Sequence, residues 1–222
     1  MPEYTLEDYI RLLATHASTE VRRNAAWQLG RYHDLRGLAP LIQAANDPAS
    51  EVRVRVMEAL GAFRDSAVLA PLLAGLSDPD ADVRAMAGQA LGAVGDPRAG
   101  DSLLVALKDP HAPTRASAAS ALGTIGATGA GESLLHAMLM DEDEGVRYAA
   151  RQSLVLLNDD QTTQVLLLAL ASLQDALDLT TLIEVLVQRR TQEALPALRA
   201  LLAHEDEGVR LTVAWAIKAL GG

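Results

Sequence analysis

The chain has 222 residues, of which 50% are hydrophobic but only 3% aromatic, and it contains no cysteine. The lack of cysteine excludes disulfides, zinc–thiolate sites and a thiol nucleophile of the chain's own. A net charge of −10, with a pI near 4.9, argues against nucleic acid as a partner, because its phosphates are themselves negatively charged.

The first expected helix covers residues 6–14. Thr5 stands in front of it as N-cap, and Asp8 follows three residues later, a pattern typical of a capping box. The N-terminus shows no secretory signal. The longest strongly apolar run, residues 165–173, is much shorter than the roughly 20 residues that a membrane span needs. We therefore expect a soluble, cytoplasmic protein.

A Val-Arg or Thr-Arg pair recurs along the chain and defines a repeat. It stands at residues 21, 52, 83 and 114, each 31 apart, and again at 146 and 209. A fixed period of this size predicts a solenoid of stacked units. We expect one domain over residues 1–222, with units at about 1–32, 33–63, 64–94, 95–126, 127–157, 158–188 and 189–222.

Each unit is expected to contain two helices, A and B. Helix A precedes an Asp-Pro pair and is expected at 38–45, 68–76, 102–107, 133–139, 163–171 and 194–202. Helix B is expected to begin at the proline itself, with the aspartate as N-cap, as in Asp47-Pro48, Asp78-Pro79 and Asp109-Pro110. A glycine recurs nine residues after each Val or Thr of the first four units. It predicts a close approach of a neighbouring helix.

The best copy of the motif runs from Asp78-Pro79 through Arg84 and Ala87 to Leu91-Gly92. This string resembles the short HEAT-like repeats first associated with phycobilisome bilin lyases. The resemblance implies an all-α fold, a right-handed α-solenoid (superhelix) of about seven two-helix HEAT-like repeats. It implies little about function, because repeats of this class serve many roles.

A polar residue stands six positions before each repeated arginine. The pairs include Asp47/Arg53, Asp78/Arg84, Asp109/Arg115 and Asp141/Arg147, with histidines in the first and last units. We interpret these pairs as a structural ladder between repeats, in which Asp and Arg neutralise each other, rather than as an arginine stripe for an anionic ligand. The ladder breaks in unit six, at Ser172 and Asp178. The break is explained either by a flexible joint or by sequence drift alone.

No catalytic constellation is visible in the sequence. Deoxyhypusine hydroxylase, built on similar repeats, holds iron with His-Glu pairs at two positions of helix B, and none of the corresponding pairs here is His-Glu. The acidic clusters lack the spacing of calcium loops. We expect no enzyme activity, no cofactor and no metal. The alternative is a HEAT-like enzyme or ligand-binding protein, either bilin lyase-like or, with less support, DNA glycosylase-like.

The residues of helix B that packing does not use form a candidate groove on its concave face. We predict a non-catalytic scaffold that binds a protein or peptide there through Arg23, Trp27, Arg31, Arg55, Met86, Gln89, Tyr148, Gln152, Leu211 and Trp215. Trp215 has an alternative role in closing the terminal repeat. Helix 176–187 is apolar nearly all round, which predicts a cover: a partner, unusual packing of the last repeats, or a second copy in a homodimer formed through them.

Overall fold

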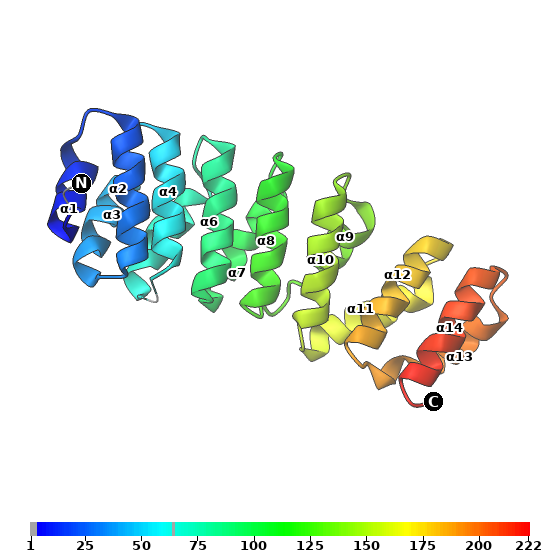
Figure 1. The fold of residues 1–222 in the computed structure, drawn as a ribbon. Helices are drawn as coiled ribbons and strands as arrows, with labels where there is room; N and C mark the ends of the chain where they lie inside the picture. Colours follow the sequence, from blue (N-terminus) through cyan, green and yellow to red (C-terminus); the bar gives the residue numbers. More distant parts are fainter. Residues whose placement is uncertain (1–3, 64) are drawn as a thin grey trace. The chain divides into compact units, whose positions relative to one another are not determined.

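The computed structural model describes residues 4–63 and 65–222, and within these ranges it contains fourteen α-helices and no β-strand. The all-α fold is therefore confirmed, and its helices form successive pairs as the repeat predicts (Figure 1). The contacts between residues divide the chain into two compact units, Met1–Ile125 and Gly126–Gly222. The expectation of a single domain over residues 1–222 stays a prediction.

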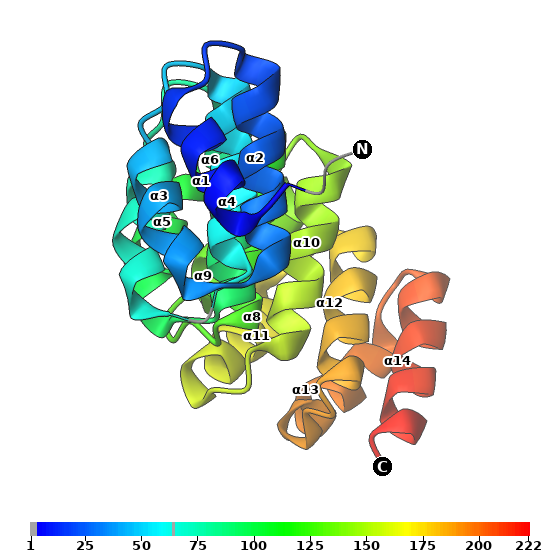
Figure 2. The same ribbon diagram turned by 60° about the vertical axis from the view of Figure 1, so that its left-hand side comes forward.

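Unit 1 contains four helical pairs in two layers. Its B helices lie side by side in one layer, and its A helices form the other (Figures 1 and 2). The pairs are α1 (Leu6–Thr15) with α2 (Thr19–Tyr32), α3 (Leu38–Ala44) with α4 (Ser50–Gly61), α5 (Leu69–Gly75) with α6 (Ala81–Val94), and α7 (Gly100–Ala106) with α8 (Ala112–Thr124).

The ends of the A helices follow from local hydrogen bonds. Thr5 caps α1, and Asp8 completes the predicted capping box from the third helical position. Asp34, Asp65 and Asp96 each accept a hydrogen bond from the backbone N–H two residues later and so begin the short 3₁₀ turns that lead into α3, α5 and α7. Because three separate repeats use the same local device, the A helices begin close to where the sequence predicts them.

The B helices begin later than expected. Helices α4, α6 and α8 start at Ser50, Ala81 and Ala112, so the prediction that each starts at its Asp-Pro proline is wrong by two residues. The reason is an Asx turn in front of the helix. Asp47 Oδ1 accepts from the N–H of Ala49 at 2.9 Å, and the equivalent bonds in the next two repeats are 2.8 Å. The aspartate therefore belongs to the turn between the helices.

The recurring glycine lies where two B helices come close together. A Cβ built on Gly61 would lie 2.8 Å from Ala90 Cβ and 3.0 Å from Ala90 Cα, and one on Gly30 would lie 2.8 Å from Ala59 Cβ. These distances are shorter than van der Waals contact, so a larger residue would push the helices apart. The predicted packing role of the glycine is confirmed at these positions.

Unit 2 contains three helical pairs. They are α9 (Gly131–Met140) with α10 (Glu144–Leu156), α11 (Asp160–Ser172) with α12 (Ala176–Gln188), and α13 (Leu195–Ala200) with α14 (Glu207–Ala219). None of the helices in the described parts of the chain combines the length and the apolar character that crossing a membrane requires.

Helix α12 is the one that is apolar nearly all round, and unit 2 itself covers most of it. Its contacts with α10, α11 and α14 bury five of its aliphatic side chains completely: Leu179, Leu182, Ile183, Val185 and Leu186. Of the three covers that the sequence left open, packing within the last repeats accounts for these five residues, because both neighbouring repeats pack against the helix. Leu177, at its N-terminal end, is 74% exposed.

Candidate functional site

A ladder of arginine–aspartate pairs links successive repeats of unit 1. In each pair, the Nε and Nη2 atoms of an arginine donate to the two carboxylate oxygens of an aspartate 25 residues later. The pairs are Arg22 with Asp47, Arg53 with Asp78 and Arg84 with Asp109, at 2.7 to 2.9 Å. Two parallel hydrogen bonds of this kind are the geometry that a planar guanidinium and a carboxylate make best.

The partner of each arginine differs from the sequence prediction. The aspartate six residues before the arginine offers its backbone carbonyl rather than its carboxylate: Arg53 Nη1 donates to Asp47 O at 2.9 Å. Arg115 and Arg147 repeat this bond with Asp109 O and Asp141 O. Each arginine in the unit 1 pairs therefore closes its own turn with one nitrogen and binds the next repeat with the other two.

These pairs are shielded from water. The side chains of Arg84 and Asp109 are 14% and 10% exposed. The hydrogen bonds from Arg84, which outweigh the opposing effect of burial, hold the pKa of Asp109 below its usual value. A shielded pair loses more when one partner is removed than an exposed pair does.

A first hollow on the helix-B face of unit 1 lies between α2 and α4. It has a volume of about 320 Å³, and Trp27, Arg31, Arg55 and Glu58 line it together with four smaller or less polar residues. The guanidinium carbon of Arg31 lies 4.8 Å from the centre of the Trp27 ring, a cation–π contact. The indole remains 40% exposed, so a partner can reach it.

A second hollow of about 540 Å³ extends across α2, α4, α6 and α8. Arg23, Arg55, Met86 and Gln89, all predicted for the groove, line it. Arg55 contributes to both hollows. Acidic side chains from the starts of α4 and α6 also contribute, so the surface carries both signs of charge. All six groove residues predicted for unit 1 therefore line one of two neighbouring hollows.

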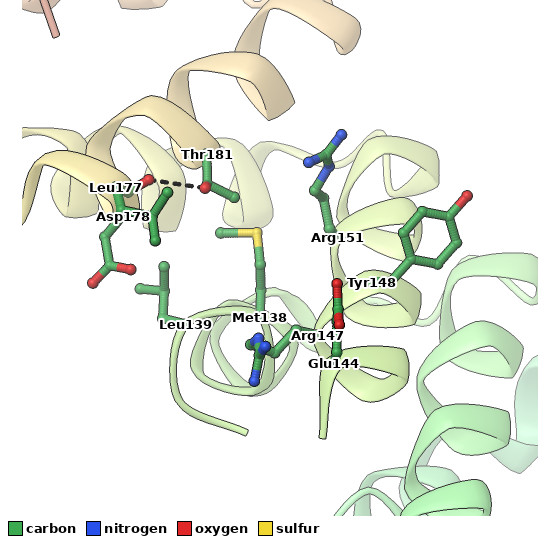
Figure 3. A pocket seen from close by; sticks show the side chains of 9 residues that line it. All are labelled: Met138, Leu139, Glu144, Arg147, Tyr148, Arg151, Leu177, Asp178 and Thr181. Atoms are coloured by element: carbon green, nitrogen blue, oxygen red, sulfur yellow. Dashed lines mark hydrogen bonds between the residues drawn. The ribbon is translucent and has the colours of Figure 1, made fainter. Parts of the chain in front are cut away.

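A third hollow, of about 470 Å³, lies in unit 2 among α9, α10 and α12 (Figure 3). Of the predicted groove residues, Tyr148 lines it, and its ring is largely exposed. The other lining residues are Met138, Leu139, Glu144, Arg147, Arg151, Leu177, Asp178 and Thr181. Within residues 4–63 and 65–222, no group of three His, Asp or Glu side chains could together hold a metal ion.

The family model for HEAT repeats matches residues 6–76 and 69–155, which together span more than half of the chain. The chain belongs to the HEAT repeat family. No curated protein matches it.

Solved HEAT-like structures show the same fold. The chain is similar to one in the complex of CpcE and CpcF of phycocyanin lyase from Nostoc sp. PCC7120, with a TM-score of 0.64, 24% identity, and 99% of this chain and 96% of that one covered. Human deoxyhypusine hydroxylase is similar with a TM-score of 0.50 and 19% identity, covering 97% and 95%. A chain from the structure of Kap95p with RanGDP reaches 0.71 at 13% identity, covering 97% and 34%. At these identities the likeness shows the fold alone.

The remaining predicted groove residues of these HEAT repeats lie apart from the hollows described above. Gln152 is half-buried on α10, and Leu211 and Trp215 are exposed on α14. Sequence reasoning assigned Arg147 to the ladder alone and missed its place in the third hollow. The signal that could have found it is Ser172, which stands 25 residues after Arg147, where three other repeats have an aspartate.

Proposed function

We propose that this HEAT repeat protein is a non-catalytic scaffold that binds a protein or peptide on its helix-B face. The observation that carries the proposal is the pair of hollows on unit 1, lined by the six residues that the repeat pattern leaves free of packing. Surface hollows next to an exposed tryptophan and arginines are typical of the central, high-affinity part of protein interfaces.

The chemistry of this surface suits a polypeptide better than a nucleic acid. Trp27 offers an apolar face, and Arg31 beside it offers hydrogen-bond donors. Glu51 and Asp82 line the second hollow together with the arginines and would repel a phosphate backbone. A peptide presents both charges and apolar side chains, so it can match such a mixed surface.

Relatives in fold also support a binding role. CpcE and CpcF form a complex, and Kap95p binding induces the switch loops of RanGDP to adopt the GTP-bound conformation. The alternative of a bilin lyase-like or glycosylase-like enzyme has only the likeness in fold to support it. The scaffold function is supported in addition by the two hollows of unit 1.

Affinity capture from the source cells with the full chain as bait tests the proposal. Trp27→Ala should remove specifically captured partners. Tyr32→Ala is the matched control, because Tyr32 belongs to the same helix and is 49% exposed, but its ring packs 6.0 Å from that of Tyr9. Trp215→Ala tests the exposed end of α14, and sedimentation of the same variant tests a homodimer formed through the C-terminal repeats.

The expected result is loss of the same partner with Trp27→Ala and its retention with Tyr32→Ala. If both variants capture the same proteins in the same amounts as the wild type, the assignment of the hollows is wrong. Thermal unfolding of each variant shows whether a loss of capture comes from a loss of folding.

A further inference from the structure

The ladder of unit 1 shows which ligand the Nε and Nη2 atoms of its arginines bind. In three consecutive repeats the Nε–Nη2 edge holds both oxygens of an aspartate carboxylate, while Nη1 is bound to carbonyls of the preceding turn. The position on helix B and the hydrogen bonds of Nη1 thus orient the Nε–Nη2 edge for one kind of ligand. That ligand is a carboxylate whose two oxygens lie in the plane of the guanidinium.

Arg147 occupies the same position on α10, but its edge has no such ligand. Its Nη1 donates to Asp141 O at 2.8 Å and to Glu142 O at 3.2 Å, as in the other repeats. Position 172, where the carboxylate would stand, is a serine whose hydroxyl donates to Ala169 O. Across residues 4–63 and 65–222, no carboxylate oxygen lies within ion-pair distance of the Arg147 guanidinium.

Arg151 and Asp178, two further charged residues that line the third hollow, do not pair with Arg147. Arg151 pairs with Glu184 at 3.3 Å. Asp178 lies across the hollow near Leu139 (Figure 3), and burial, together with the neighbouring Asp175, raises its pKa, as expected for a carboxyl without a close cation.

The hollow has room and apolar surface beside the arginine. Its volume of about 470 Å³ can take several side chains. Met138, Leu139 and Leu177 line it, with Tyr148 at one side (Figure 3). Leu177 is 74% exposed, and an apolar group covering it would remove this surface from water.

We propose that Arg147 binds the carboxylate of an aspartate in a peptide segment of a protein partner, which supplies the ladder carboxylate that position 172 lacks. The residue next to that aspartate packs on Leu177 and Leu139. The hollow contains two arginines and two acidic side chains, so its charge is balanced. It therefore selects a single, well-oriented carboxylate rather than a polyphosphate. The peptide nature of the occupant rests on the proposed scaffold function.

The test uses the full chain and a peptide whose only carboxylate is known to fit this kind of edge. That peptide is the chain's own segment 45–50 (Ala-Asn-Asp-Pro-Ala-Ser) with blocked ends, in which Asp47 is the residue that binds Arg22. Its Asp47→Asn version is the control. Binding is measured by NMR from the Arg147 Nε–H and Tyr148 ring signals, assigned by substitution.

We expect saturable shifts of both signals with the aspartate peptide. Affinity should fall about tenfold or more with the asparagine peptide or with Arg147→Lys, because neither can form the two charge-assisted bonds. Arg210→Lys is the matched control: Arg210 makes the same turn bonds, to His204 O and Glu205 O, in the last repeat, and its substitution should leave the Arg147 shifts unchanged. Leu177→Ser changes an exposed residue that the fold does not need, and it should weaken binding severalfold.

The proposal is overturned if the asparagine peptide binds as well as the aspartate peptide, or if inorganic phosphate produces the same shifts at the same concentration. It is also overturned if Leu177→Ser and Arg147→Lys, both folded, bind like the wild type. This outcome is separable from the proposed function, because the capture experiment depends on Trp27 in unit 1 and is read independently.

Discussion

Replacing Asp109 with asparagine should destabilise the protein by about 2 kcal/mol, as expected for the loss of hydrogen bonds to a charged group. The substitution keeps the shape of the side chain and the Oδ1 atom that accepts from the N–H of His111 at 2.8 Å, so the turn before α8 is preserved. It removes the charge and one of the two acceptors of Arg84. Asp78 and Asp80 also act electrostatically on Arg84, which limits the loss.

Asp96→Asn is the matched control for this change. Asp96 likewise accepts from a backbone N–H two residues later, at 2.9 Å, and pairs with an arginine, Arg98. That arginine, however, is 63% exposed and belongs to the same turn rather than to a neighbouring repeat. Because exposed pairs contribute little, this variant should lose at most about a quarter as much stability.

Thermal and urea unfolding followed by far-ultraviolet circular dichroism measure both variants. A loss of about 2 kcal/mol corresponds to a fall in Tm of roughly 4 to 8 °C for a protein of this size. Equal losses in Asp109→Asn and Asp96→Asn would refute the reasoning, since the contact between repeats would then contribute no more than a local surface pair. The same conclusion follows if the Tm of Asp109→Asn equals that of the wild type.

Three further predictions follow from the packing and from the charges. Gly61→Ala should lower the Tm despite the better helix propensity of alanine, because overpacking against Ala90 costs about 1 to 3 kcal/mol. An unchanged or higher Tm would show that the two helices can move apart at no cost. The pKa of Asp109 is lowered in the folded protein, so its contribution to stability is complete above the unfolded pKa of about 4 and is lost as the pH falls through the folded value. Acid unfolding of Asp109→Asn should therefore be less steep than that of the wild type, and equal slopes would contradict this. Arg189→Ala should lower the free energy of unfolding by about 2 to 4 kcal/mol, because it leaves the carbonyls of Leu154 and Leu157 at the end of α10 without their donor. Urea unfolding measures this, and a loss below about 1 kcal/mol would exclude the capping role of Arg189.

Much of the fold could be predicted because each repeat carries its own local signals. The Val-Arg period, the Thr5 capping box and the aspartates that open the A helices act within a few residues of the chain, so the sequence alone indicates where helices begin and end. The start of helix B was missed because Asp47-Pro48 fits a helix N-terminus and an Asx turn equally well at the level of sequence. The choice follows from Arg22, which holds the Asp47 side chain from the preceding repeat.

The same distinction applies to the candidate sites: some of their residues follow from spacing within a helix, and others depend on contacts between repeats. The six groove residues predicted for unit 1 line hollows because a helical period separates the packed face of helix B from its free face. The arginine whose side chain pairs with the Asp109 carboxylate could not be identified from the sequence. Two arginines fit the repeat: Arg115 stands 6 residues after Asp109, and Arg84 stands 25 residues before it. The choice depends on how one repeat is rotated onto the next.

The sequence by itself determined the repeat, the pairing of helices and the glycines at which B helices approach each other, because these depend on short-range spacing that recurs. Only the tertiary structure decided which side chains meet. It showed that unit 2 covers most of α12 with its own helices, and that Arg147, which has no carboxylate partner among the described residues, lines a hollow. The physical reason is that burial and ion pairing depend on contacts between repeats, which the order of residues within one repeat does not specify.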